Sequence, residues 1–83
     1  MLAFVLIRVP AKQVDRTLDR LRSLDGIAEA SAVYGETDII AKLEVPDQPA
    51  LDELVIRNIQ SLPEVEATRT FLAVGGMHWT REA

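Results

Sequence analysis

The chain has 83 residues, of which 48% are hydrophobic and 27% charged, and its formal net charge at pH 7 is −4. This length provides for one domain, and the composition is that of an ordinary globular protein. The negative balance argues against a nucleic-acid-binding surface, which depends on clustered Lys and Arg. The sequence has no cysteine, which excludes disulfides, thiolate metal sites and a cysteine nucleophile.

Residues 2–9 form a continuous β-branched and aromatic run, which predicts a central strand buried on both faces. The run lacks a basic segment before it and falls far short of the roughly 20 apolar residues that cross a bilayer. We therefore expect a cytoplasmic protein with no membrane anchor. After Pro10 the apolar spacing becomes helical, and Asp25-Gly26 ends that helix because glycine adopts a positive φ at low cost. The helix would bury Val14, Leu18, Leu21 and Leu24.

Residues 27–33 and 38–45 predict the second and third strands, joined by a hairpin loop in which Gly35 takes a positive φ. The third strand would bury Ile39, Ala41, Leu43 and Val45. Pro49 suits the first turn of a second helix. Its apolar stripe comprises Leu51, Leu54, Val55, Ile59 and Leu62. Residues 65–74 predict the last strand, which completes a domain over residues 1–74, and residues 75–83 form a polar tail.

A helix end, a buried Leu, a tight turn and a strand start occur twice, at Ser23 to Ile27 and at Ser61 to Val65. The order of elements is therefore βαββαβ. Right-handed crossovers place both helices on one face of a four-stranded antiparallel sheet with strand order 4-1-3-2. This is the ferredoxin-like α+β fold.

Two helices cover only one face of such a sheet, yet the first and last strands carry apolar residues on both sides. Each buried Leu, Ile or Phe is worth roughly 1.5–3 kcal/mol, and monomers rarely tolerate a large exposed apolar patch. We therefore predict a two-fold dimer, sheet against sheet. The alternative is that the tail, with Met77 and Trp79, folds back over the patch.

Three motifs occur in a characteristic order: Tyr34-Gly35-Glu36-Thr37-Asp38-Ile39-Ile40-Ala41-Lys42, then Ser61-Leu62-Pro63-Glu64-Val65, then Thr68-Arg69-Thr70. Together they resemble the C-terminal effector domain of the Lrp/AsnC transcription regulators, also called the RAM domain. The resemblance covers residues 1–74. It implies a ferredoxin-like domain that dimerises through its sheet and assembles dimers into tetramers or octamers. It also implies that a free amino acid binds near the dimer–dimer junction.

Matched to that family, the ligand-binding residues are Gly35, Asp38, Thr68 and Thr70, with Tyr34, Glu36 and Thr37 lining the loop. Asp38 is a candidate partner for the ligand's ammonium group, and the two threonines are candidate donors to its carboxylate. Structural explanations remain open, because Asp38 could stabilise the turn and the threonines could simply favour a strand. No cofactor or metal is implied.

The sequence departs from the family in two respects. The chain begins directly in the first strand, so we expect no helix-turn-helix and no direct binding of nucleic acid. Glu64 replaces the usual glycine of the Leu-Pro-Gly-Val turn, so that turn must do without a positive φ or accept strain.

Other function classes find less support. A small dimeric ferredoxin-like enzyme, of the monooxygenase or isomerase type, needs a base or nucleophile, and the single histidine, His78, lies in the tail. A metal chaperone of this fold needs a Cys pair, and an RNA-binding domain needs aromatics and basic charge. A pure scaffold that co-assembles with full-length Lrp/AsnC regulators remains open. We predict a non-enzymatic amino-acid-binding and oligomerisation module that regulates by ligand-dependent assembly.

Overall fold

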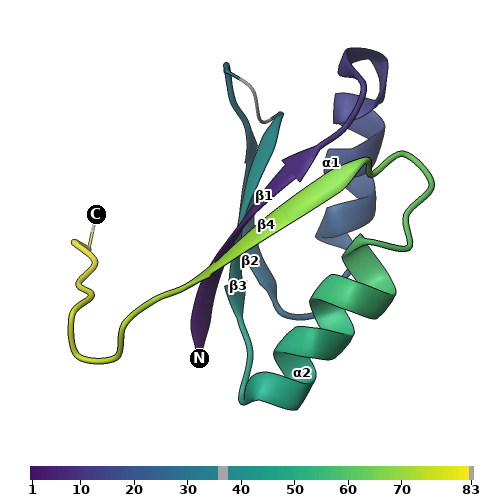
Figure 1. The fold of residues 1–83 in the computed structure, drawn as a ribbon. Helices are drawn as coiled ribbons and strands as arrows, with labels where there is room; N and C mark the ends of the chain where they lie inside the picture. The colour runs from purple at the N-terminus through teal and green to yellow at the C-terminus, as the bar shows by residue number, and fades with distance from the viewer. Residues whose placement is uncertain (36–37, 83) are drawn as a thin grey trace.

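The computed structural model describes residues 1–35 and 38–82 (Figure 1). One antiparallel sheet contains β1 (Leu2–Arg8), β2 (Ile27–Ala32), β3 (Ile39–Glu44) and β4 (Ala67–Leu72). The strands lie in the order β2-β3-β1-β4, which is the predicted order 4-1-3-2 viewed from the opposite edge. The ferredoxin-like α+β fold is therefore confirmed.

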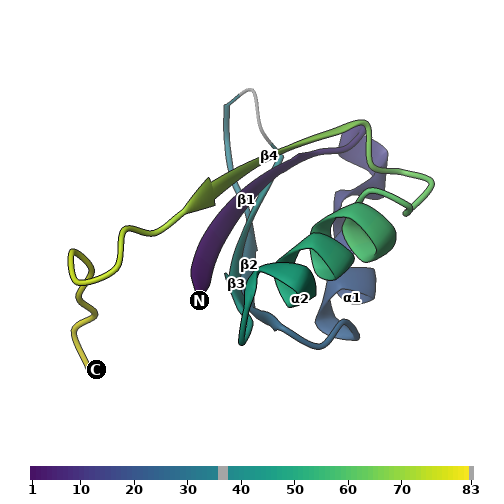
Figure 2. The ribbon, with the colours of Figure 1, turned by 60° about the horizontal axis from the view of Figure 1, so that its bottom comes forward.

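Both helices lie on the same face of the sheet (Figures 1 and 2). The first comprises a short 3₁₀ turn, η1 (Ala11–Gln13), followed by α1 (Val14–Arg22). The second begins as α2 (Gln48–Asp52) and continues directly into η2 (Glu53–Ile59), which has π-type hydrogen bonding. Asp47 caps α2 by accepting the Ala50 N–H at 3.0 Å. Pro49 lies in the first turn, as predicted.

The core lies between the sheet and the helices, where alternate residues of β1 and β3 point inward. Ile39, Ala41, Leu43 and Val45 are buried, as predicted. The second helix buries Leu51, Leu54, Val55 and Ile59, whereas Leu62 is partly buried. On the first helix Leu21 is fully buried and Val14 and Leu18 pack at the margin of the core, as does Leu24, which lies beyond the end of α1.

Two details of the core differ from prediction. The β1 strand is buried on one face only in the single chain, since Leu2, Phe4 and Leu6 on its other side are partly exposed. Thr17 is fully buried although its hydroxyl is polar. That hydroxyl donates to the Gln13 carbonyl oxygen at 2.7 Å, so its burial leaves no unsatisfied donor.

The turn at Glu64 dispenses with a positive φ, because glycines alone adopt one among the described residues. The Glu64 side chain instead lies against α1, where its Oε1 is 2.9 Å from Arg20 Nε. The Glu64 side chain is 6% exposed and that of Arg20 is 38% exposed. Neither atom has another hydrogen-bond partner among the described residues. This ion pair therefore joins α1 to the segment that leads into β4.

We expect Glu64→Gln to lower the free energy of unfolding by about 1–2 kcal/mol. Breaking a fully buried pair costs about 3–5 kcal/mol, but the exposed part of Arg20 allows water to solvate the remaining charge. Urea denaturation of the two proteins measures the difference. Glu53→Gln is the matched control, because its partner Arg57 is 3.2 Å away on the exposed surface of η2. If both variants lost the same free energy of unfolding, the Glu64–Arg20 pair would be no more stabilising than the exposed Glu53–Arg57 pair.

Within residues 1–35 and 38–82, no helix is long and apolar enough to cross a bilayer. The same residues include no cluster of His, Asp and Glu that could hold a metal ion.

Candidate functional site

Residues 33–35, which follow β2, extend beyond the end of the sheet (Figure 1). Gly35 has φ +123°, as predicted, and a Cβ at this position would meet nothing within 4 Å. The Tyr34 side chain is fully exposed. The Val33 N–H donates to the Asp38 carbonyl oxygen at 3.1 Å and closes the hairpin. Glu36 and Thr37, the two other predicted loop residues, lie outside the described residues.

Asp38 lies at the base of the hairpin and has a structural bond. Its Oδ2 accepts the Val9 N–H at 3.1 Å, just past the end of β1. The sequence analysis considered a role for Asp38 in stabilising its own turn. In the structure its hydrogen bond instead links two segments that are 29 residues apart in the chain. This carboxylate therefore fixes the position of the hairpin relative to β1.

Thr68 and Thr70 share one face of β4, as their period-two spacing predicts. They lie opposite Ile7 and Val5 of β1, so both point to the helix side of the sheet. The Thr68 Oγ1 accepts a hydrogen bond from Gln60 Nε2 at 2.8 Å. Thr68 and Gln60 line an open hollow of about 400 Å³, together with Val65, Glu66 and Ala67.

Thr70 lines a different hollow, of about 280 Å³, between β4 and the second helix. The other lining residues are Gln48, Leu51, Asp52, Val55, Ile56 and Leu72. Asp38 precedes β3, and β1 lies between β3 and β4. The single chain thus presents the predicted site residues in separate places: the hairpin on one side of β1, and the two threonines on the other.

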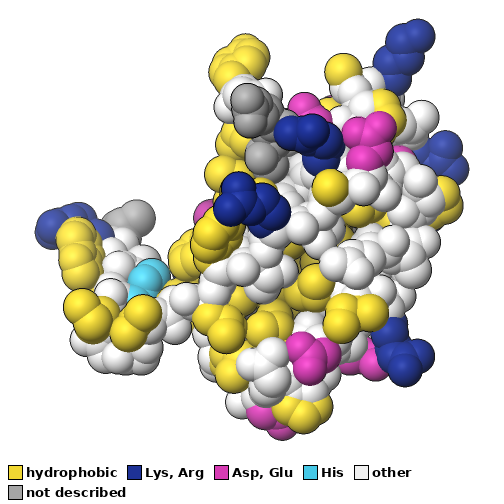
Figure 3. Space-filling view, viewed as in Figure 1, with side chains coloured by type: hydrophobic (Ala, Val, Ile, Leu, Met, Phe, Trp, Pro, Cys, Tyr) yellow, Lys and Arg dark blue, Asp and Glu magenta, His cyan; other side chains and the backbone are white. Residues whose placement is uncertain are grey.

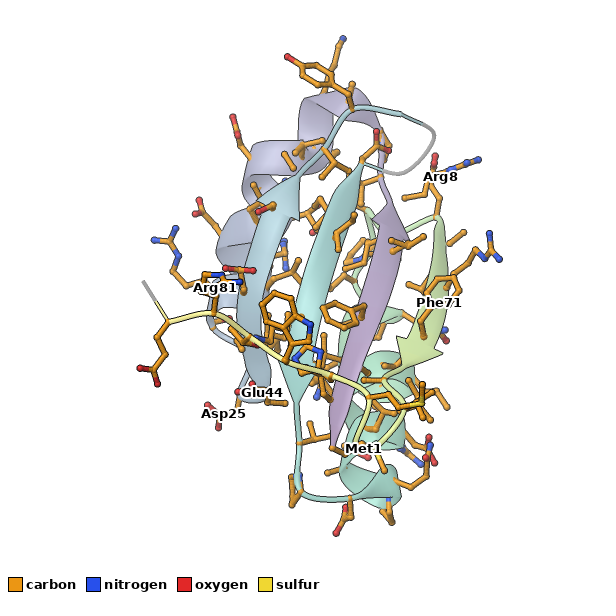
Figure 4. All side chains as sticks on the ribbon, turned by 90° about the vertical axis from the view of Figure 1, so that its left-hand side faces the viewer. Met1, Arg8, Asp25, Glu44, Phe71 and Arg81 are labelled. Carbon is orange, nitrogen blue, oxygen red and sulfur yellow. The ribbon has the colours of Figure 1, made fainter. Side chains whose placement is uncertain are left out.

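The sheet face opposite the helices carries several large apolar side chains that the helices do not cover. We call it the bare face; its large apolar side chains are Leu2, Phe4, Leu6, Ile40 and Phe71. Figure 3 shows hydrophobic side chains gathered on this side of the molecule, and Figure 4 views the face directly. Phe4 lies opposite Phe71 across the β1–β4 pair, and the Arg69 guanidinium lies 5.4 Å from the Phe71 ring centroid.

The tail does not bury the bare face in this structure. Met77 is 81% exposed and Trp79 is 74% exposed. The His78 ring approaches the face, with its centroid 6.4 Å from that of Phe4. Phe71 nevertheless remains 47% exposed. The apolar patch predicted from the sequence is thus present and still accessible.

The chain resembles known proteins in both sequence and fold. The family model described as Lrp/AsnC ligand binding domain matches residues 2–77. A crystal structure of a Thermus thermophilus protein is 35% identical with a TM-score of 0.86, and the match covers 96% of this chain and 98% of that one. The sequence matched no curated protein.

Two longer proteins also align with the chain. Escherichia coli AsnC is 27% identical with a TM-score of 0.88; the match covers 98% of this chain but 55% of AsnC, so the chain spans about half its length. A Neisseria meningitidis transcriptional regulator, solved as a complex with L-Met, has the same fold at 20% identity and a TM-score of 0.82. That match covers 95% of this chain and 53% of the regulator. From the family match and the shared architecture, the chain belongs to the Lrp/AsnC ligand-binding domain family.

Proposed function

We propose that this protein is a non-enzymatic module that binds a free amino acid and regulates by ligand-dependent assembly. One observation carries the proposal: Gly35 and Asp38 lie on one side of β1 and Thr68 lies on the other, in two halves that a single chain does not join. The hairpin with Gly35 and Asp38 is one half, and the hollow at Thr68 is the other. A complete site then requires the hairpin of one subunit to meet the hollow of another.

The two halves suit the two ends of an amino-acid zwitterion. Asp38 supplies a carboxylate for the ammonium group, and its bond to Val9 holds that carboxylate in place. Gly35 allows the ligand to approach backbone N–H groups closely. On the other half, Gln60 and Thr68 supply an amide and a hydroxyl, which can bind the ligand carboxylate. Because both subunits contact the ligand, binding favours the assembled state.

Assembly would begin with the bare face. Two copies related by a two-fold axis would bury Leu2, Phe4, Leu6, Ile40 and Phe71 against each other, and sheets pack in this way about 10 Å apart. The dimers would then join into a tetramer or octamer through contacts that include the hairpin. Relatives support the ligand class, since the Neisseria meningitidis regulator was solved with L-Met.

A thermal-shift screen against the twenty amino acids tests the proposal. A ligand present at 100 times its Kd stabilises the assembly by about 2.7 kcal/mol, which corresponds to roughly 10–20 °C for a domain of this size. We expect Asp38→Asn to weaken binding at least tenfold, because it removes the charge that attracts the ammonium group. The unliganded melting temperature of this variant should change little, since the amide oxygen can still accept the Val9 N–H.

Asp38→Ala is the paired control, because it removes both the charge and the acceptor. It should also lower the unliganded stability by about 1–3 kcal/mol. A screen in which no amino acid shifts the melting temperature would contradict amino-acid binding. The remaining function would then be a scaffold that co-assembles with full-length regulators, which size exclusion of a mixture would detect as a shared peak.

A further inference from the structure

The tail, residues 75–82, leaves β4 at a glycine turn and passes in front of the bare face. Gly76 has φ +79°, and the Met77 N–H donates to the Val74 carbonyl oxygen at 3.1 Å. In Figure 4, Phe71 lies on β4 at one side of the sheet and Arg81 lies toward β2 at the other. Figure 1 shows the tail standing off the sheet on the side away from the helices. Anything that packs on the bare face therefore meets the tail as well.

The tail carries large apolar side chains that its own domain leaves exposed. Met77 and Trp79 are 81% and 74% exposed, although the ring contact between His78 and Phe4 brings the tail toward the sheet. The Arg81 guanidinium lies 5.2 Å from the Trp79 ring centroid, within the range of a cation–π contact. Exposed aromatic and Met side chains beside an uncovered apolar face are typical of a protein interface.

We propose that the tail is an arm that clasps a second copy of this chain, with Trp79 and Met77 packing on the partner at the margin of the sheet-to-sheet interface. This inference rests on the proposed dimer. In a two-fold dimer the second copy occupies the space in front of the bare face, on the side where the tail stands. Each tail then contacts the other copy at an equivalent position, and the interface gains two aromatic anchors.

The distribution of charge also favours a second copy of this chain as the partner of the tail. The bare face carries Glu29 and the Lys42–Glu44 pair toward its β2–β3 side. Arg81 brings a cation into the layer in front of that side of the face (Figure 4). Two copies that each carry a net charge of −4 repel one another overall, so a cation in the layer between the two sheets offsets part of that repulsion.

The sequence contains one tryptophan, so its fluorescence reports directly on the tail. We would dilute the full chain from high to low concentration, following tryptophan emission and, in parallel, molecular mass by sedimentation equilibrium. The expected result is a blue-shifted emission that moves to the red at the same concentration at which the dimer dissociates. A dimer with the emission of a water-exposed indole would overturn the arm while leaving the sheet dimer intact. A monomer at every concentration would overturn both.

Two variants distinguish a specific contact of Trp79 with the partner from non-specific association of exposed apolar side chains. Trp79→Ala should raise the dimer dissociation constant at least tenfold. Ile56→Ala is the matched control, since Ile56 is an apolar residue 58% exposed on η2, on the helix side of the molecule; its effect should stay below twofold. Circular dichroism of each variant verifies that the domain is folded. Equal effects from the two substitutions, or no effect from Trp79→Ala, would contradict the proposal.

Discussion

Phe71→Asp is expected to yield a folded monomer at concentrations where the unmodified chain is a dimer. Phe71 is half exposed on the bare face, so a polar residue costs the isolated domain little. In the proposed dimer the same position is buried twice, once in each copy. Losing a buried Phe costs roughly 1.5–3 kcal/mol, and an unpaired carboxylate in an apolar interface adds to that cost. We expect the dimer dissociation constant to rise by a factor of about 100 or more.

Sedimentation equilibrium of both proteins measures this change, and Ile56→Asp is the control. Ile56 is also an exposed apolar residue, but it lies on η2 on the opposite side of the molecule. The control should retain the mass of the unmodified protein. If Phe71→Asp remained dimeric while Ile56→Asp dissociated, the interface would lie on the helix side instead.

Gly26→Ala is expected to destabilise the domain by about 2–5 kcal/mol. Gly26 has φ +97°, and an added Cβ would lie 2.9 Å from Leu54 Cδ2 and 3.2 Å from Val45 Cγ1. The conformation costs a residue with a Cβ about 1–2 kcal/mol, and overpacking a core adds about 1–3 kcal/mol. Both neighbours are themselves buried, which limits how far they can move. The melting temperature should fall by roughly 10–40 °C.

Gly35→Ala provides the control for conformation without crowding. Gly35 also has a positive φ, but a Cβ added there would have no atom within 4 Å. Gly35→Ala should therefore lower the free energy of unfolding by about 1–2 kcal/mol. Calorimetry of the unmodified protein and the two variants separates the cost of the backbone conformation from the cost of crowding the core. Equal losses at Gly26 and Gly35 would show that contact with Leu54 and Val45 contributes nothing.

The fold could be predicted because its determinants are local. Alternation in residues 38–45 specified the buried face of β3, and the glycine at position 26 marked the turn after the first helix. Thr17 was missed because its burial depends on a hydroxyl bond to Gln13 that apolar periodicity does not register. The π-type geometry of η2 was also missed, since a helical stripe of apolar residues does not distinguish the two kinds of helix.

The candidate site was less predictable, because it depends on tertiary contacts. Family motifs pointed to Asp38 and Thr68, but their partners, Val9 and Gln60, lie in other parts of the chain, just past the ends of β1 and η2. Nothing in the spacing of residues along the chain pairs Gln60 with Thr68 until the second helix packs beside β4. Likewise, the sequence left open whether the turn at Glu64 is strained, whereas the structure pairs its buried side chain with Arg20 of α1.

The mass in solution tests most directly whether the bare face meets a second copy of the chain. Sedimentation equilibrium of the unmodified protein at micromolar concentration should give at least twice the 9.2 kDa chain mass. Adding the amino acid that raises the melting temperature should shift the distribution toward larger multiples. A single species of 9.2 kDa, with and without that ligand, would contradict the account.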